Sequence, residues 1–230
     1  MTDSLKDHWQ EQAHAYDVFS RRVIPYYDEL QSAAAAQLCF SAGNGLSILD
    51  AGCGTGTTTR TVKLRFPSAR ITAMDLTEKM LALARQRMED LNGIEYVLAD
   101  FTQDPLNGPF DAVISAMALH HIADGKAKDA FYGRIFDALK AGGMFVNADM
   151  ILGEDAAQQN FNMARWKEHL RRSYTDEEIE KEWVPRYYAT DHPRRLSEET
   201  AGLRAAGFAK VDVAWRRDHL AVIVAQKAPV

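Results

Sequence analysis

The sequence Leu49-Asp-Ala-Gly-Cys-Gly-Thr-Gly56 decides the fold, because it joins a predicted strand to a predicted helix. The apolar run of residues 46–50 (LSILD) leads into the glycines, and a helical pattern over residues 57–66 follows them until Pro67. Glycines at such a turn let the backbone bend sharply and approach a ligand, and the following helix directs its free N–H groups toward that ligand. Only Thr55 separates Gly54 from Gly56, so the spacing differs from the dinucleotide fingerprint GxGxxG. The stretch therefore predicts a ligand-binding loop of a different kind.

Strand and helix patterns alternate on the carboxyl side of this loop. Apolar runs of strand length occur at residues 70–75, 94–99, 110–116, 144–150, 211–215 and 220–225, and helical patterns occur at residues 78–91, 126–140 and 197–206. Strands separated by helices indicate an α/β fold, here a doubly wound and mostly parallel sheet with helices on both faces. The short link of residues 216–219 predicts an antiparallel hairpin for the last two strands. Thr77 is the expected N-cap of the helix that begins at Glu78.

Two segments lie outside the alternation. We expect residues 1–44 to form an N-terminal helical cap and residues 45–230 to form the ligand-binding domain. Within that domain, residues 153–192 form a predicted helical insertion after the fifth strand, rich in aromatic and charged side chains. The insertion is either a decoration with a solvated face or a lid over a ligand cleft. The lid has support because ligands of such sheets bind at the carboxyl ends of the strands, where this connection starts.

Composition excludes several classes of protein. The chain has 230 residues, is 47% hydrophobic and carries a formal net charge of −5, which disfavours a nucleic acid partner. The two cysteines, Cys39 and Cys53, cannot build a disulfide framework, so a reducing compartment is expected. No His, Cys or acid set has the spacing of metal ligands, so we expect no metal. Without an apolar run of about 20 residues or a signal core, we expect a cytoplasmic protein that does not bind membranes.

Acidic residues follow three successive predicted strands. Asp50 precedes the glycines, Asp75 ends the second strand and Asp100 ends the third, next to Phe101. An acid at the end of the second strand accepts hydrogen bonds from ribose hydroxyls. Asp100 and Phe101 can bind an adenine amino group and pack against its ring. A single acid of this kind is often only a helix cap, but three beside one glycine loop predict a nucleoside site.

The ordered motifs resemble those of the class I S-adenosylmethionine (SAM) methyltransferases. They are LDAGCGTG at 49–56, AMDLTEKML at 73–81, ADF at 99–101, FDAVISAMALHHI at 110–122, ALKAGGMFV at 138–146 and AGF at 206–208. The resemblance implies a Rossmann-like, seven-stranded sheet whose last strand inserts antiparallel. It also implies a set of cofactor contacts: the loop residues Ala51, Gly52, Cys53, Gly54 and Gly56 for the methionine end, Asp75 and Leu76 for the ribose, Asp100 and Phe101 for the adenine, and Ser115 nearby. Asp50 can accept hydrogen bonds from the loop or from the ligand's ammonium group.

Residues 21–27 (RRVIPYY) are similar to a segment of the carboxy-SAM synthase branch. That resemblance implies that Tyr27 contacts the cofactor and that Arg186 lies near the arginine which holds the extra carboxylate in this branch. Methyl transfer to a small molecule, with S-adenosyl-L-homocysteine as product, is the first hypothesis, and the accepting atom stays open. The alternatives are a carboxy-SAM synthase-like enzyme and a non-catalytic SAM-binding regulatory module.

The remaining candidates concern the methyl acceptor. His120 follows the fourth strand and is either a general base, a hydrogen-bond donor to substrate, or a structural histidine. Tyr16 and Phe19 can present aromatic faces to a sulfonium or a cationic substrate, or pack against the sheet. Trp166 and Arg186 of the insertion are further candidates for substrate binding. The absence of a [DN]PPY motif argues against amino groups of DNA or protein glutamine as acceptors, and a homodimer is one expected assembly.

Overall fold

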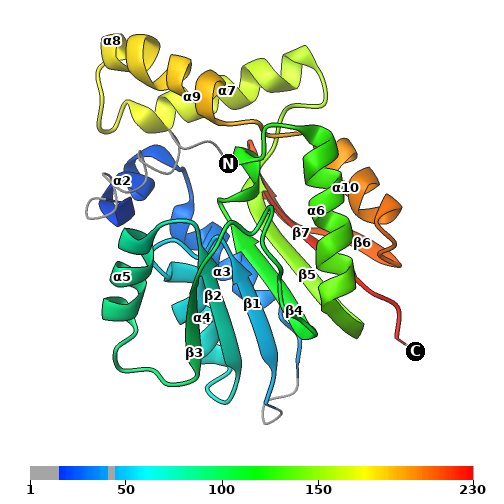
Figure 1. Ribbon diagram of the computed structural model, residues 1–230. Coiled ribbons are helices and arrows are strands. Elements are labelled where there is room, and N and C mark those ends of the chain that lie inside the picture. Colours follow the sequence, from blue (N-terminus) through cyan, green and yellow to red (C-terminus); the bar gives the residue numbers. More distant parts are fainter. Residues whose placement is uncertain (1–15, 41–44, 230) are drawn as a thin grey trace.

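A single seven-stranded sheet forms the centre of the molecule (Figure 1). The structure, a computed structural model, describes residues 16–40 and 45–229. The strands are β1 (Ser47–Ala51), β2 (Arg70–Asp75), β3 (Ile94–Leu98), β4 (Phe110–Ala116), β5 (Leu139–Met150), β6 (Lys210–Arg217) and β7 (Leu220–Gln226), in the order β3-β2-β1-β4-β5-β7-β6. β7 runs antiparallel to both β5 and β6, and the other pairs are parallel. The predicted fold and the antiparallel insertion of the last strand are confirmed.

Helices cover both faces of this sheet. One face carries α3 (Tyr27–Ala36), α4 (Thr57–Arg65) and α5 (Glu78–Arg87), and the other carries α6 (Gly125–Ala138) and α10 (Leu196–Ala205). Successive strand residues point to opposite faces: Ile48 packs with Leu30 of α3, whereas Leu49 belongs to the core that contains Phe131 of α6. Continuous apolar strands are therefore buried on both sides.

A third group of helices lies beyond the carboxyl ends of the strands, in the upper part of Figure 1. This helical cover consists of α2 (Tyr16–Val23), α7 (Ala156–Leu170), α8 (Asp176–Glu178), the π-helical turn η3 (Ile179–Trp183) and α9 (Val184–Thr190). It has its own apolar core, in which Trp166, Ile179 and Trp183 pack with Phe19 and Val23. The N-terminal segment and the insertion are thus packed against each other.

Several boundaries differ from the sequence prediction. The helix expected to reach residue 140 ends at Ala138, and β5 begins at Leu139 because the main chain there already pairs with Phe110 of β4. The helix expected over residues 78–91 ends at Arg87. Within the predicted N-terminal cap, α3 packs on the sheet and α2 joins the cover, while residues 1–15 and 41–44 lie outside the described part. No helix among the described residues has the length and apolar character that a membrane crossing requires.

Candidate active site

The loop between β1 and α4 bends around the end of β2. The backbone N–H groups of Gly52 and Cys53 both donate to the carbonyl oxygen of Met74 at 2.9 Å. Gly52 has a φ of +78°, and a Cβ atom on it would lie 2.6 Å from the Cβ of Ala118. Gly54 has a φ of +54° and no atom within 4 Å of the position of a Cβ. The glycines therefore serve two needs: a close contact at Gly52 and an open backbone surface at Gly54.

Asp75 holds this loop from the neighbouring strand. Its Oδ2 accepts a hydrogen bond from the Gly54 N–H at 2.9 Å, and its Oδ1 accepts from the Thr77 N–H at 2.9 Å and the Thr77 hydroxyl at 3.1 Å. Thr77 precedes α5 as predicted, but its hydroxyl bonds Asp75 and makes no side-chain cap. Burial raises the pKa of Asp75, although these hydrogen bonds act against the rise.

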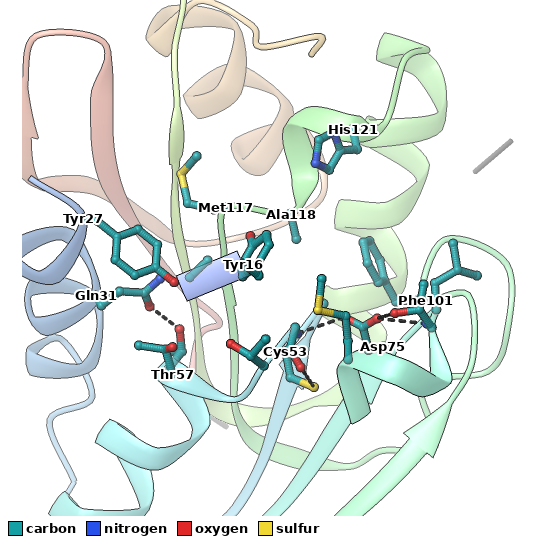
Figure 2. A pocket seen from close by; sticks show the side chains of 18 residues that line it. Tyr16, Tyr27, Gln31, Cys53, Thr57, Asp75, Phe101, Met117, Ala118 and His121 are labelled. Carbon is teal, nitrogen blue, oxygen red and sulfur yellow. Dashed lines mark hydrogen bonds between the residues drawn. The ribbon is translucent and has the colours of Figure 1, made fainter. Parts of the chain in front are cut away.

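A cavity of about 690 Å³ opens above the loop, and we call it the loop cavity (Figure 2). Its lining includes seven of the predicted cofactor contacts: Tyr27, Gly52, Cys53, Gly54, Asp75, Leu76 and Phe101. Tyr16, predicted as a substrate contact, lines it as well. The structure therefore brings residues from α2, α3 and three strand ends to one hollow.

Five other predicted cofactor residues, Asp50, Ala51, Gly56, Asp100 and Ser115, are absent from the described lining. The Asp50 carboxylate is buried and accepts from the Thr59 hydroxyl at 2.5 Å, and burial raises its pKa to about 7. The Ser115 hydroxyl donates to the Ala51 carbonyl oxygen at 2.7 Å. These contacts support the base of the loop, and a direct cofactor contact for these residues stays a prediction.

Gly56 and Asp100 have local structural contacts instead. Gly56 has a φ of +83°, and a Cβ on it would meet the Met88 side chain at 2.6 Å. Asp100 Oδ1 accepts from the N–H of Thr102 at 2.9 Å and from its hydroxyl at 2.6 Å. Gly56 thus makes room for the packing of Met88, and Asp100 orders the turn after β3.

Several residues that line the loop cavity were not predicted from the sequence. These are Gln31, Thr55, Thr57, Thr58, Met80, Met117, Ala118 and His121. Thr57 and Thr58 form the first turn of α4, so their position after the glycines was a usable signal. Gln31 accepts a hydrogen bond from the Thr58 hydroxyl. Because the two residues belong to different helices, no local sequence pattern predicts this contact.

A second cavity of about 630 Å³ lies between the sheet and the helical cover, and we call it the cover cavity. The predicted residues Tyr16, Phe19, Trp166, Arg186 and His120 all line it. Tyr16, Met117 and His121 line both cavities, so the two hollows adjoin at these side chains. The aromatic residues of the insertion therefore lie over a cleft, as the lid interpretation expects.

His120 is paired with a carboxylate that the sequence analysis did not single out. Nδ1 of His120 lies 2.5 Å from Oδ1 of Asp149 on β5, and the His120 N–H donates to Oδ2 of the same residue at 2.9 Å. Burial lowers the pKa of His120, but the charge and hydrogen bond of Asp149 outweigh it, so the pKa is raised. Asp149 had a signal in the sequence, because it is an acid inside the apolar strand 144–150.

His121 and Asp191 lie beside His120. Nδ1 of His121 is 3.6 Å from Oδ1 of Asp191, and Nε2 of His120 is 3.9 Å from the same oxygen. Burial and the charge of His120 hold the pKa of His121 well below its ordinary value, and burial raises the pKa of Asp191. Asp191 is distant in sequence from the histidines, so no spacing rule could have joined them.

Arg186 is half-buried in the wall of the cover cavity. Its guanidinium lies 5.4 Å from the centre of the Phe19 ring and 5.6 Å from that of Trp183. Burial lowers the pKa of Arg186. It is the only Lys or Arg among the described residues that line this cavity, so any anionic group there would meet a cation held by aromatic faces.

Comparison with known proteins agrees with this architecture. Residues 48–143 match the family described as "Methyltransferase domain". A malonyl-[acyl-carrier protein] O-methyltransferase of Acetivibrio thermocellus is 33% identical over 111 residues, which cover 48% of this chain and 38% of that protein. The match thus spans well under two thirds of that relative. A carboxy-S-adenosyl-L-methionine synthase of Methylococcus capsulatus is 27% identical over 223 residues, covering 94% of this chain and 90% of that protein.

The fold has close counterparts among solved structures. The DhpI–SAM–HEP complex superposes with a TM-score of 0.67 at 22% sequence identity, covering 97% of this chain and 96% of that one. At that identity the similarity concerns the fold, and the seven-stranded order with its antiparallel β7 is what the two share. Together with the matched domain and the relatives, it confirms the resemblance seen in the motifs. Residues 48–143 are a methyltransferase domain, and the ordered motifs and the fold of the chain are those of the class I SAM-dependent methyltransferases.

Proposed function

We propose that this protein transfers the methyl group of SAM to a small molecule held in the cover cavity. The observation that carries the proposal is the junction of the two cavities at Tyr16, Met117 and His121. Methyl transfer is an in-line displacement, so donor and acceptor must meet end to end at such a junction. The bound cofactor would supply an electrophilic methyl group on a sulfonium.

The loop cavity fits this cofactor. The open backbone at Gly54 gives room for an amino-acid end, and the Asp75 carboxylate reaches the lining, where ribose hydroxyls can donate to it. Leu76, Met80 and Phe101 supply apolar surface suited to an adenine ring. The N-terminus of α4 adds N–H groups that favour a carboxylate.

His120 is our candidate for activating the acceptor. Its Nδ1 is held by Asp149, so Nε2 is the ring atom left to face the cover cavity, which His120 helps to line. A nitrogen in that position can receive the proton of a hydroxyl as the methyl group arrives. The aromatic wall of Phe19, Trp166 and Trp183 would keep water away from the reacting atoms.

Calorimetry with SAM and with S-adenosyl-L-homocysteine tests the assignment. We expect saturable binding of both with dissociation constants on the order of micromolar, since many cofactor sites fall in that range. Binding followed by acceptor-dependent formation of S-adenosyl-L-homocysteine would support methyl transfer. If neither compound gives heat or saturation, the proposed function is wrong.

A carboxy-SAM synthase-like reaction is the second candidate. It is favoured by the similarity to the Methylococcus capsulatus enzyme over 94% of this chain and by the Arg186 guanidinium in the wall of the cover cavity. Mass spectrometry of the compound released from purified protein separates the two candidates. A carboxylated SAM would favour the second candidate, whereas only SAM or its demethylated product would count against it.

The predictions of assembly and cellular location rest on the sequence alone. A homodimer stays a prediction, and light scattering of the purified chain would measure its native mass. The cytoplasmic location and the absence of nucleic acid partners are predictions too, the latter resting on the net charge of −5.

A further inference from the structure

We propose that His120, His121 and Asp191 form a binding site for one divalent first-row transition-metal ion. The two histidines belong to the short 3-10 helix η2 (Leu119–His121) after β4, and Asp191 follows α9 of the helical cover. One ligand atom from each residue can be chosen so that all three lie within 4.8 Å of one another. A hydrogen bond from the His192 N–H to the His120 carbonyl oxygen, at 2.7 Å, fastens the two segments together.

The separations suit a shared ion better than direct hydrogen bonds. Asp191 Oδ1 lies 3.6 Å from Nδ1 of His121 and 3.9 Å from Nε2 of His120. Hydrogen bonds between such groups need about 2.7–3.2 Å. Two ligand atoms at about 2.1 Å from a tetrahedral ion are about 3.4 Å apart, so an ion between these groups would require only small side-chain shifts.

The surroundings of His120 also fit a metal ligand. Asp149 accepts from Nδ1 at 2.5 Å and so fixes the ring and leaves Nε2 as the donor atom. A carboxylate behind a ligating imidazole is the usual support of a metal site. Around the other ligands, the Thr190 hydroxyl donates to Asp191 Oδ1 at 2.9 Å, and Nδ1 of His121 lies 3.3 Å from the Thr190 carbonyl oxygen. An ion bound to Nδ1 of His121 would replace the contact of this atom with the Thr190 carbonyl oxygen.

The donor set determines the class of ion. Two imidazoles and one carboxylate suit Zn²⁺, Fe²⁺, Co²⁺ or Mn²⁺ better than Ca²⁺ or Mg²⁺, which prefer oxygen ligands. Three protein ligands leave at least one coordination position for a small molecule. All three residues line the cover cavity, so that position is accessible from the space assigned to the acceptor.

An ion at this place changes how an acceptor would be activated. With the ion bound, Nε2 of His120 is a ligand and cannot receive a proton, and the metal would instead lower the pKa of a coordinated hydroxyl. Without the ion, His120 keeps the role proposed above. This consequence rests on the proposed function, whereas binding of the ion does not.

The test uses the untagged full chain, freed of metals by a chelator and dialysed. Cobalt(II) is added and its visible absorption is followed, and Zn²⁺ is then added as a competitor. We expect one Co²⁺ per chain, with a spectrum of nitrogen and oxygen ligands, displaced by Zn²⁺. The inference is overturned if the wild-type chain takes up neither ion at millimolar concentration.

Variants locate the ion. Asp191→Asn and His121→Ala should each weaken Co²⁺ binding at least about 10-fold, since even the loss of supporting groups costs that much. Asp191→Glu keeps a carboxylate and should bind more tightly than Asp191→Asn. His169→Ala removes a half-buried histidine that lines neither cavity and should bind like the wild type. Equal binding by all variants would place the ion elsewhere and refute the site.

Calorimetry with SAM in the presence of a chelator keeps the two proposals apart. SAM binding without any uptake of Co²⁺ or Zn²⁺ would contradict only the metal site. Uptake of Co²⁺ that depends on His121 and Asp191, in a chain that does not bind SAM, would support the metal site and contradict the proposed function. Circular dichroism of each variant confirms that a loss of binding is not a loss of folding.

Discussion

The loop cavity and the cover cavity are of similar size, yet they are built by different means. The loop cavity is framed by backbone: Gly52 and Gly54 form part of its wall, and Asp75 bonds the main chain of the loop directly. The cover cavity is framed by side chains, many of them aromatic, from α2, α7, η3 and α9. A wall of backbone fixed to a sheet tolerates little change, whereas a wall of side chains on packed helices can be altered residue by residue. Acceptor specificity is therefore expected to reside in the cover.

The largest effect that separates the two regions is expected for Gly52→Val. The new side chain would meet Ala118 at 2.6 Å and would sit at a φ of +78°, which a β-branched residue strongly disfavours. We expect SAM binding to be lost in calorimetry. Gly54→Ala is the matched control, because there is open space around the position of its Cβ. The substitution should destabilise the loop conformation by only about 1–2 kcal/mol, the cost of a left-handed backbone in a residue with a Cβ. Equal effects of both variants would show that the contact with Ala118 is unimportant.

A pH-dependent effect is expected for Asp50→Asn in the absence of SAM. Burial raises the folded-state pKa of Asp50 from 3.8 to about 7, so the folded state holds a proton that the unfolded state has released. This group therefore contributes stability below about pH 4 that is lost as the pH rises toward about 7, by at most about 4 kcal/mol. Urea unfolding at several pH values should show wild type falling relative to Asp50→Asn over that range. A constant difference between the two would contradict the buried, protonated carboxyl.

Asp75→Ala should affect the loop cavity alone. It removes an acceptor for ribose hydroxyls and the bond that holds the Gly54 N–H, so SAM binding should weaken by about 1–3 kcal/mol. Arg186→Met is the contrasting variant, because Arg186 lines only the cover cavity. We expect it to leave SAM affinity unchanged in calorimetry while altering the KM for the acceptor. A loss of SAM affinity on Arg186→Met would instead bring that side chain close to the cofactor.

The smallest effect is expected for Trp166→Phe in the cover. The indole N–H donates to the Val23 carbonyl oxygen at 2.9 Å and so ties α7 to α2. Its loss should cost about 0.5–1.5 kcal/mol. Hydrogen exchange should rise in α2 and α7 and stay unchanged in the sheet. If exchange rises equally in β1 and β4, the cover is not a separate cooperative unit.

The contrast between the backbone-framed loop cavity and the side-chain-framed cover cavity also explains which features could be predicted from the sequence. The strands, the glycine loop and Asp75 follow from local patterns, since each apolar run ends in a turn signal within a few residues. The start of β5 was missed because residues 139 and 140 continue a helical pattern while their backbone pairs with β4. The partners of His120, namely Asp149 and Asp191, are brought to it by the sheet and the cover, so only the three-dimensional arrangement reveals them.

Tyr16 stands at the junction of both cavities, on a helix that the indole of Trp166 fastens to the insertion. A compound in one cavity that moves this ring would change the binding free energy of a compound in the other cavity. Thermodynamic linkage makes the effect mutual. If each compound favours the same position of the Tyr16 ring, we expect cofactor and acceptor to bind cooperatively. With such coupling, the departure of either product would weaken the binding of the other.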